Sequence, residues 1–107
     1  MSASAHSTST LQPYIEAFPG LASTIGPLLE TRLDDPTNRA RCWIAVLEFL
    51  AATSDGRTLC IVVDDAQWLD PVSAGLTAFL ARANLATGLH MVVTGRPTKD
   101  SFVWNSL

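Results

Sequence analysis

Two adjacent carboxylates, Asp64 and Asp65, follow the most apolar segment of the chain, "TLCIVV" at residues 58–63. Side chains of an extended backbone alternate between two faces, so neighbouring acids favour different tasks. Adjacent carboxylates also repel each other, and a hard cation such as Mg²⁺, held by one carboxylate and several waters, relieves that repulsion. The other carboxylate can then orient or deprotonate a water. Hydrolysis of a nucleoside triphosphate requires both roles, a ligand for the metal ion and a group that activates the attacking water.

The elements that position the two acids form a strand, a helix and a second strand. The run at 59–63 is rich in β-branched residues and does not alternate, which predicts a strand covered on both faces. Asp70 and Pro71 predict the cap and first residue of a helix, and Gly88 its end. A second strand is expected at about 89–94, and strands joined in this way are parallel.

Ligands of open parallel sheets bind beyond the carboxyl ends of the strands. Asp64, Asp65 and Arg96 are all expected at that end. The helix after Pro71 carries an apolar stripe that is expected to face the core: Val72, Leu76, Phe79, Leu80 and Ala83.

An earlier helix is predicted from Pro36, capped by Asp35 and closed by Gly56. Arg41 and Glu48 mark its solvated side. Its expected buried face consists of Ala40, Trp43, Ile44, Leu47, Leu50 and Ala51.

The chain begins with residues 1–10, which are expected to form a disordered polar tail. One or two short helices are expected in residues 11–33, because proline and glycine interrupt that segment repeatedly. The predicted organisation is therefore a tail followed by one α/β domain at 11–107.

Composition favours a globular interior, with 48% hydrophobic and 16% charged residues. The net charge of −3 offers no basic field to nucleic acid or to an anionic membrane, and no apolar run approaches the roughly 20 residues of a spanning helix. Cys42 and Cys60 both lie in apolar patterns and are expected to be buried, reduced thiols of a cytoplasmic protein.

The string "LCIVVDDAQWLDPVSAGLTAFLARA" followed by "LHMVVTGRP" resembles part of the nucleotide-binding domain of LuxR-type large ATP-binding regulators and their MalT-like relatives. These belong to the AAA- and STAND-type P-loop ATPases. The family pattern is an apolar strand, two acids, two residues, Trp, one residue and Asp, which Asp64, Asp65, Trp68 and Asp70 fill here. The resemblance covers roughly residues 21–97.

The resemblance implies roles for three residues and a partial three-layer P-loop NTPase-like fold with flanking helices. Asp64 matches the Walker B acid that coordinates Mg²⁺, and Asp65 matches the catalytic acid that positions the attacking water. Arg96 matches a sensor-like arginine that approaches the γ-phosphate of ATP. ATP and Mg²⁺ are the implied cofactors, in a complete domain.

The chain departs from the family at the phosphate loop. A Walker A motif reads G-x-x-x-x-G-K-[ST], and no glycine pair here has that spacing before the single lysine, Lys99. The family's DNA-binding helix-turn-helix has no counterpart either, so direct contact with nucleic acid is not expected. The chain resembles an interior piece of a larger bacterial transcriptional regulator and is not expected to hydrolyse ATP alone.

Two other hypotheses stay open. Two strands without neighbours at their edges invite pairing with another chain, so the protein could dock on a full-length ATPase or self-associate. It could also be a non-functional gene remnant.

Simpler interpretations of the single residues stay open too. The paired acids could be a polar end to a buried strand, and Arg96 a solvated arginine. Asp70 is expected to be a cap, and Trp68 a packing residue whose indole N–H finds a local acceptor.

Overall fold

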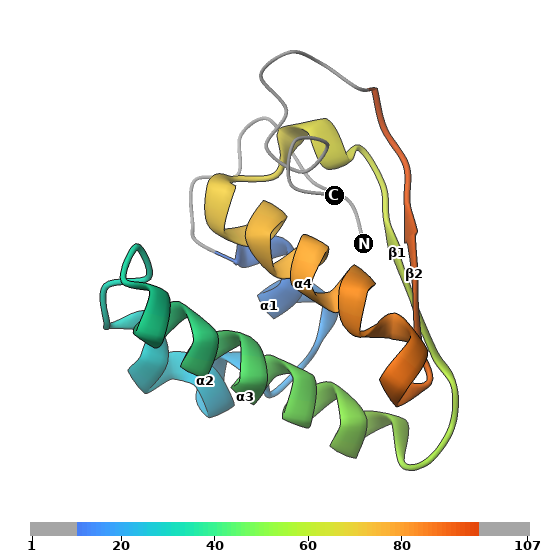
Figure 1. The fold of residues 1–107 in the computed structure, drawn as a ribbon, viewed down its shortest axis with the longest axis horizontal. Helices are drawn as coiled ribbons and strands as arrows, with labels where there is room; N and C mark the ends of the chain where they lie inside the picture. Colours follow the sequence, from blue (N-terminus) through green and yellow to red (C-terminus); the bar gives the residue numbers. More distant parts are fainter. Residues whose placement is uncertain (1–10, 97–107) are drawn as a thin grey trace.

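The computed structural model describes residues 11–96, so the expected tail at 1–10 and the end of the expected domain at 11–107 lie outside the described residues. The described part is a small mixed α/β domain with four α-helices and a two-stranded parallel sheet (Figure 1). Its elements in chain order are α1 (Gln12–Ala17), α2 (Leu21–Leu29), α3 (Pro36–Ser54), β1 (Leu59–Val63), the 3-10 turn η1 (Ala66–Trp68), α4 (Pro71–Thr87) and β2 (Leu89–Val93).

Both predicted helix starts are confirmed. The Asp35 carboxylate accepts hydrogen bonds from the backbone N–H groups of Thr37 and Asn38 at the start of α3. Asp70 accepts one from the N–H of Ser73 at 3.1 Å at the start of α4, so its role as a cap is confirmed. These side chains satisfy N–H groups that have no partner inside a first helical turn.

The helix ends also follow the sequence closely. Gly88 caps α4 with a φ of 72°, a left-handed conformation that glycine adopts without a Cβ clash. α3 ends at Ser54, and its C-cap is Asp55 in the left-handed region, one residue before the predicted Gly56. One or two short helices were expected in residues 11–33, and the structure has two, α1 and α2.

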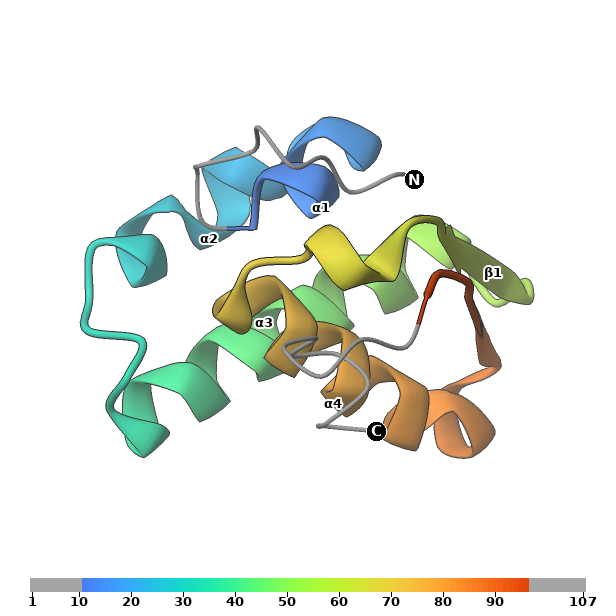
Figure 2. The ribbon, with the colours of Figure 1, turned by 90° about the horizontal axis from the view of Figure 1, so that it is seen from above.

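The two strands pair in parallel, in a register that runs from Leu59 beside Leu89 to Val63 beside Val93. The predicted β1 is confirmed, and β2 ends one residue before the expected 94. α4 connects the strands and packs on β2, while α1, α2 and α3 lie farther from the sheet on the same side (Figures 1 and 2). The sheet therefore has helices on one face.

The prediction that the first strand is covered on both faces is wrong. Ile61 and Val63 are buried, but Val62 is 46% exposed and Val92 of β2 is 45% exposed. Cys60 is exposed as well. A non-alternating apolar sequence gives a strand the capacity to be covered twice, and the described residues supply one covering layer. The described residues form the expected strand–helix–strand unit and its flanking helices. The three-layer P-loop NTPase-like fold stays a prediction.

The buried face of α3 was predicted only in part. Trp43 and Leu50 are buried as expected, but Cys42 and Val46 complete the buried stripe. Ile44 is half exposed, and Ala40 and Ala51 are exposed as well. The helix is apolar around much of its circumference, and its contacts with both α2 and α4 select which stripe is buried.

The expected stripe of α4 is confirmed at its centre, where Leu76 and Leu80 are fully buried. Thr77 of α4 is also fully buried, and its hydroxyl donates to the carbonyl of Ser73 at 2.8 Å. Its oxygen is then left to accept a hydrogen bond from the hydroxyl of Tyr14 in α1. Burial raises the pKa of Tyr14, because the phenolate would lose its hydration.

Candidate functional site

The carboxyl ends of β1 and β2 are joined by a small hydrogen-bonded cluster. Asp64 directly follows β1, and Thr94 directly follows β2. The hydroxyl of Thr94 donates to Oδ1 of Asp64 at 2.8 Å, and the N–H of Thr94 donates to the carbonyl of Val63 at 2.8 Å. The Asp64 carboxylate is thus held in place while its residue stays exposed.

Asp65 begins the turn that leaves the strand. Its φ of 54° and ψ of 44° lie in the left-handed region, which aspartate tolerates better than most residues. Its N–H donates to Oδ1 of Asp64 at 3.0 Å, whereas its own carboxylate is exposed and has no hydrogen bond within residues 11–96. The two acids are therefore in different environments, as alternating side chains predict.

The turn after β1 is fastened to the segment after β2. The N–H of Ala66 donates to the carbonyl of Thr94 at 2.9 Å, and the N–H of Arg96 donates to Oε1 of Gln67 at 3.1 Å. These bonds bring the backbone of Arg96 to the same end of the sheet as Asp64. Gln67 and Thr94 were not predicted as site residues, although Gln67 directly precedes Trp68 and Thr94 lies two residues before Arg96.

Gly95 makes this close approach possible. Its φ is 150°, and a Cβ built there would lie 2.9 Å from the nitrogen of Ala66 and would overlap Oε1 of Gln67. Only glycine fits a backbone that has this conformation and so little space. This close contact of Gly95, directly before Arg96, could not be predicted from the sequence, because Gln67 lies nearly 30 residues away in the chain.

Trp68 does not pack as expected. It is 52% exposed, and no hydrogen bond of its indole N–H is present among the described residues. The 3-10 turn instead directs Ala66 and Leu69 into the core. Three residues per turn place Ala66 and Leu69 on the same side and Trp68 on another.

The thiols are not alike either. Cys42 is buried and Cys60 is exposed, and both are free. The prediction that Cys60 is buried is wrong, because it lies on the sheet face that no described helix covers. Burial raises the pKa of the Cys42 thiol.

The strand end fits Mg²⁺ in one limited way. Within residues 11–96 no group of three or more His, Cys, Asp or Glu residues could enclose a metal ion. Asp64 nevertheless offers one fixed carboxylate, whose Oδ1 takes both hydrogen bonds while Oδ2 makes none among the described residues. Mg²⁺ is commonly held by one or two carboxylates and several waters. The sequence has no comparable group for the phosphates of ATP, because it lacks the Walker A motif whose backbone N–H groups and lysine bind them.

Comparison with known proteins gives no family for the chain: no protein-family model, curated protein or solved structure matches it significantly. Among the described helices, none is long and apolar enough to cross a bilayer.

Proposed function

We propose that the chain is the Walker B-to-sensor segment of an ATP-binding domain of a bacterial transcriptional regulator, acting in the cytoplasm. The observation that carries the proposal is the fixed carboxylate of Asp64 at the carboxyl end of a parallel strand, beside the exposed carboxylate of Asp65. Such a strand end is where open α/β sheets bind ligands.

Three residues have separate roles in this proposal. Asp64 holds a hydrated Mg²⁺ through Oδ2, because its other oxygen is occupied by hydrogen bonds from Thr94 and Asp65. Asp65, whose carboxylate has no partner among residues 11–96, orients the attacking water. Arg96 follows β2 at the same end and stabilises charge on the γ-phosphate.

The segment needs a phosphate-binding partner before it can act on ATP. A phosphate loop supplies backbone N–H groups and a lysine that neutralise the β- and γ-phosphates, and this sequence contains neither motif nor a lysine at the right spacing. We therefore expect no ATP hydrolysis by the chain alone, and no tight binding of a fluorescent ATP analogue in the presence of Mg²⁺.

The cation site is testable without ATP. Mn²⁺, which resembles Mg²⁺ in its ligand preference, broadens the NMR signals of amides close to it. The proposal predicts that Mn²⁺ broadens the amide signals of Asp64, Asp65 and Thr94 first, and that Asp64→Asn removes this selectivity. Asp55→Asn is the matched control, because Asp55 is an exposed aspartate outside the strand end. Selective broadening that survives in Asp64→Asn would contradict the proposal.

A second candidate function is docking on another protein, and the exposed sheet favours it. β1 and β2 have only each other as neighbours within the described residues, and Val62 and Val92 present apolar surface on the uncovered face. Such strands pair readily with further strands. The partner would be a full-length ATPase chain or a second copy of this chain.

Light scattering during gel filtration tests the second copy. Self-association through this face predicts that the molar mass of the wild type rises from that of a monomer to that of a dimer as the protein concentration increases. The molar mass of Val92→Lys should stay that of a monomer. A monomer at every concentration, with a sharp cooperative melt, would argue against it.

A further inference from the structure

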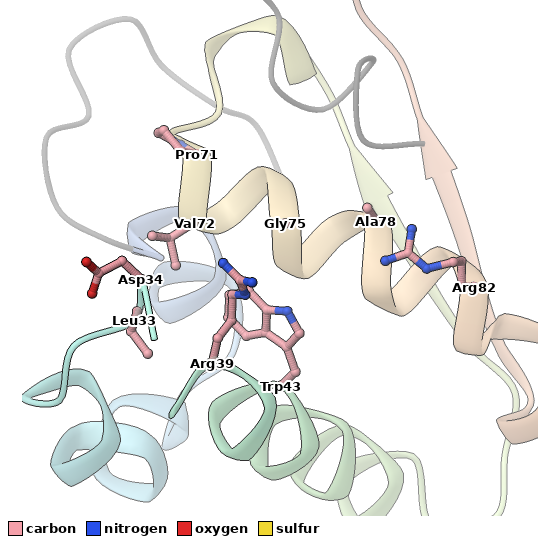
Figure 3. A pocket seen from close by; sticks show the side chains of 9 residues that line it. All are labelled: Leu33, Asp34, Arg39, Trp43, Pro71, Val72, Gly75, Ala78 and Arg82. Atoms are coloured by element: carbon pink, nitrogen blue, oxygen red, sulfur yellow. The ribbon is translucent and has the colours of Figure 1, made fainter. Parts of the chain in front are cut away.

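A cavity of about 450 Å³ lies on the helical side of the molecule, away from the strand end. It is half open to solvent and is lined by residues of α3, α4 and the loop before α3 (Figure 3). None of the residues that line it belongs to the cluster of Asp64, Asp65, Gln67, Thr94 and Arg96. Pockets of roughly 300–1,000 Å³ are of the size that holds small organic ligands.

The cavity has an aromatic wall that depends on a glycine. Trp43 of α3 approaches α4 at Gly75, where a Cβ would lie 3.4 Å from Cζ2 of the indole. The missing side chain lets the flat ring stand between the two helices, as Figure 3 shows. Leu33 and Val72 add aliphatic surface to the same cavity. Trp43 is only 7% exposed, so the small exposed part of its indole and the aliphatic side chains together form the apolar surface that a flat ligand can contact.

The charged groups at the cavity are mainly positive. Arg39 of α3 and Arg82 of α4 both line it, with Arg39 beside Trp43 (Figure 3). The one acid in the lining, Asp34, accepts two hydrogen bonds from Arg32, at 2.9 and 3.3 Å. Its charge is therefore already paired outside the cavity. The Arg32 bonds lower the pKa of Asp34, and Arg39 adds a smaller effect in the same direction.

We propose that this cavity binds a small organic anion with a flat apolar body and a carboxylate or sulfonate group. The body lies against Trp43 and the aliphatic wall, and the anionic group pairs with the guanidinium of Arg39. Guanidinium groups bind such anions through two parallel hydrogen bonds, which also fix the orientation of the ligand. The inference is independent of the proposed function, because it uses none of the strand-end residues.

A pair of dyes tests the proposal. Anilinonaphthalene sulfonate has a flat apolar body and an anionic group, and N-phenylnaphthylamine has the same body without the charge. Both are expected to fluoresce on binding to the wild-type protein. Arg39→Gln is expected to weaken binding of the sulfonate by roughly tenfold, the size of effect that one lost charge-assisted contact produces. It should leave binding of the neutral dye within about twofold of the wild type.

Matched variants distinguish dye binding in the cavity from dye binding elsewhere on the protein surface. Arg41→Gln removes the same charge from an exposed position of α3 outside the cavity and should change neither affinity. Val72→Phe fills the cavity and should abolish binding of both dyes; Leu33→Phe, in the loop, serves the same purpose if Val72→Phe melts early by circular dichroism. Equal losses in Arg39→Gln and Arg41→Gln, unchanged binding in the folded filling variant, or no binding by the wild type would each overturn the proposal.

Discussion

The helical layer and the sheet differ in how completely the described chain covers them. In the helical layer Val46, Leu76 and Leu80 are fully buried, and the hydroxyl of Tyr14 has a hydrogen-bond partner. In the sheet, alternate residues of both strands are exposed. The candidate strand-end site belongs to the less covered region. The positions of the residues in this site therefore depend mainly on hydrogen bonds and on the close approach that Gly95 permits, and less on burial of side chains.

The largest contrast is expected from matched truncations in the two regions. Leu80→Ala removes a fully buried side chain and should lower the free energy of unfolding by about 2–5 kcal/mol, because it leaves a cavity. Val92→Ala, on the uncovered sheet face, should change it by less than about 0.5 kcal/mol. Urea denaturation measures both. Equal losses would mean that the face of Val92 is covered in solution.

A smaller effect is expected at the glycine that fastens the strand ends. Gly95→Ala should destabilise the fold by roughly 1–3 kcal/mol, because the new Cβ meets Gln67 and Ala66 in a strained backbone conformation. Gly56→Ala has a left-handed φ of 78° but open space around it, so it should cost only about 1 kcal/mol. Thermal melts compare the two variants. A loss at Gly56 as large as that at Gly95 would show that the close contact contributes nothing.

The smallest expected effect concerns pH and the helical layer. The pKa of Tyr14 is raised by burial in the folded state, so its contribution to stability is complete below the ordinary tyrosine pKa of about 10. Above that pH the unfolded chain ionises first, and stability should fall. Tyr14 is the only tyrosine, so tyrosinate absorbance reports on it alone.

Tyr14→Phe provides the control for this pH dependence. It should cost about 1 kcal/mol at neutral pH and flatten the alkaline decline, since Thr77 keeps its bond to Ser73. Ionisation of Tyr14 in the folded protein at its ordinary pKa would contradict its burial.

Local signals in the sequence predicted the elements well. Asp35 with Pro36 and Asp70 with Pro71 each combine a side-chain acceptor with a residue that needs no N–H partner, so they mark helix starts without tertiary information. The strand–helix–strand unit followed from the spacing of these signals. The position of Asp64, Asp65 and Arg96 at one end of the sheet then followed from parallel pairing.

Properties that depend on the neighbours of an element could not be predicted in the same way. The apolar sequence of β1 is compatible with one or two covered faces, so Cys60 and Val62 were wrongly expected inside. The stripe of α3 that is buried depends on where α2 and α4 lie. At the site, the contacts of Thr94, Gln67 and Gly95 join segments about 30 residues apart and have no short-range signature.

The two cysteines test the contrast between the regions most directly, because each region contains one of them. Labelling with a small maleimide, followed by mass spectrometry at low protein concentration, should modify Cys60 rapidly in the folded protein. Cys42 should react at least roughly a hundredfold more slowly, since it needs an opening of the helical core and its raised pKa disfavours the thiolate. In Cys60→Ser, the remaining thiol should become reactive only across the urea transition. Equal protection of both thiols in the folded monomer would contradict the one-sided sheet.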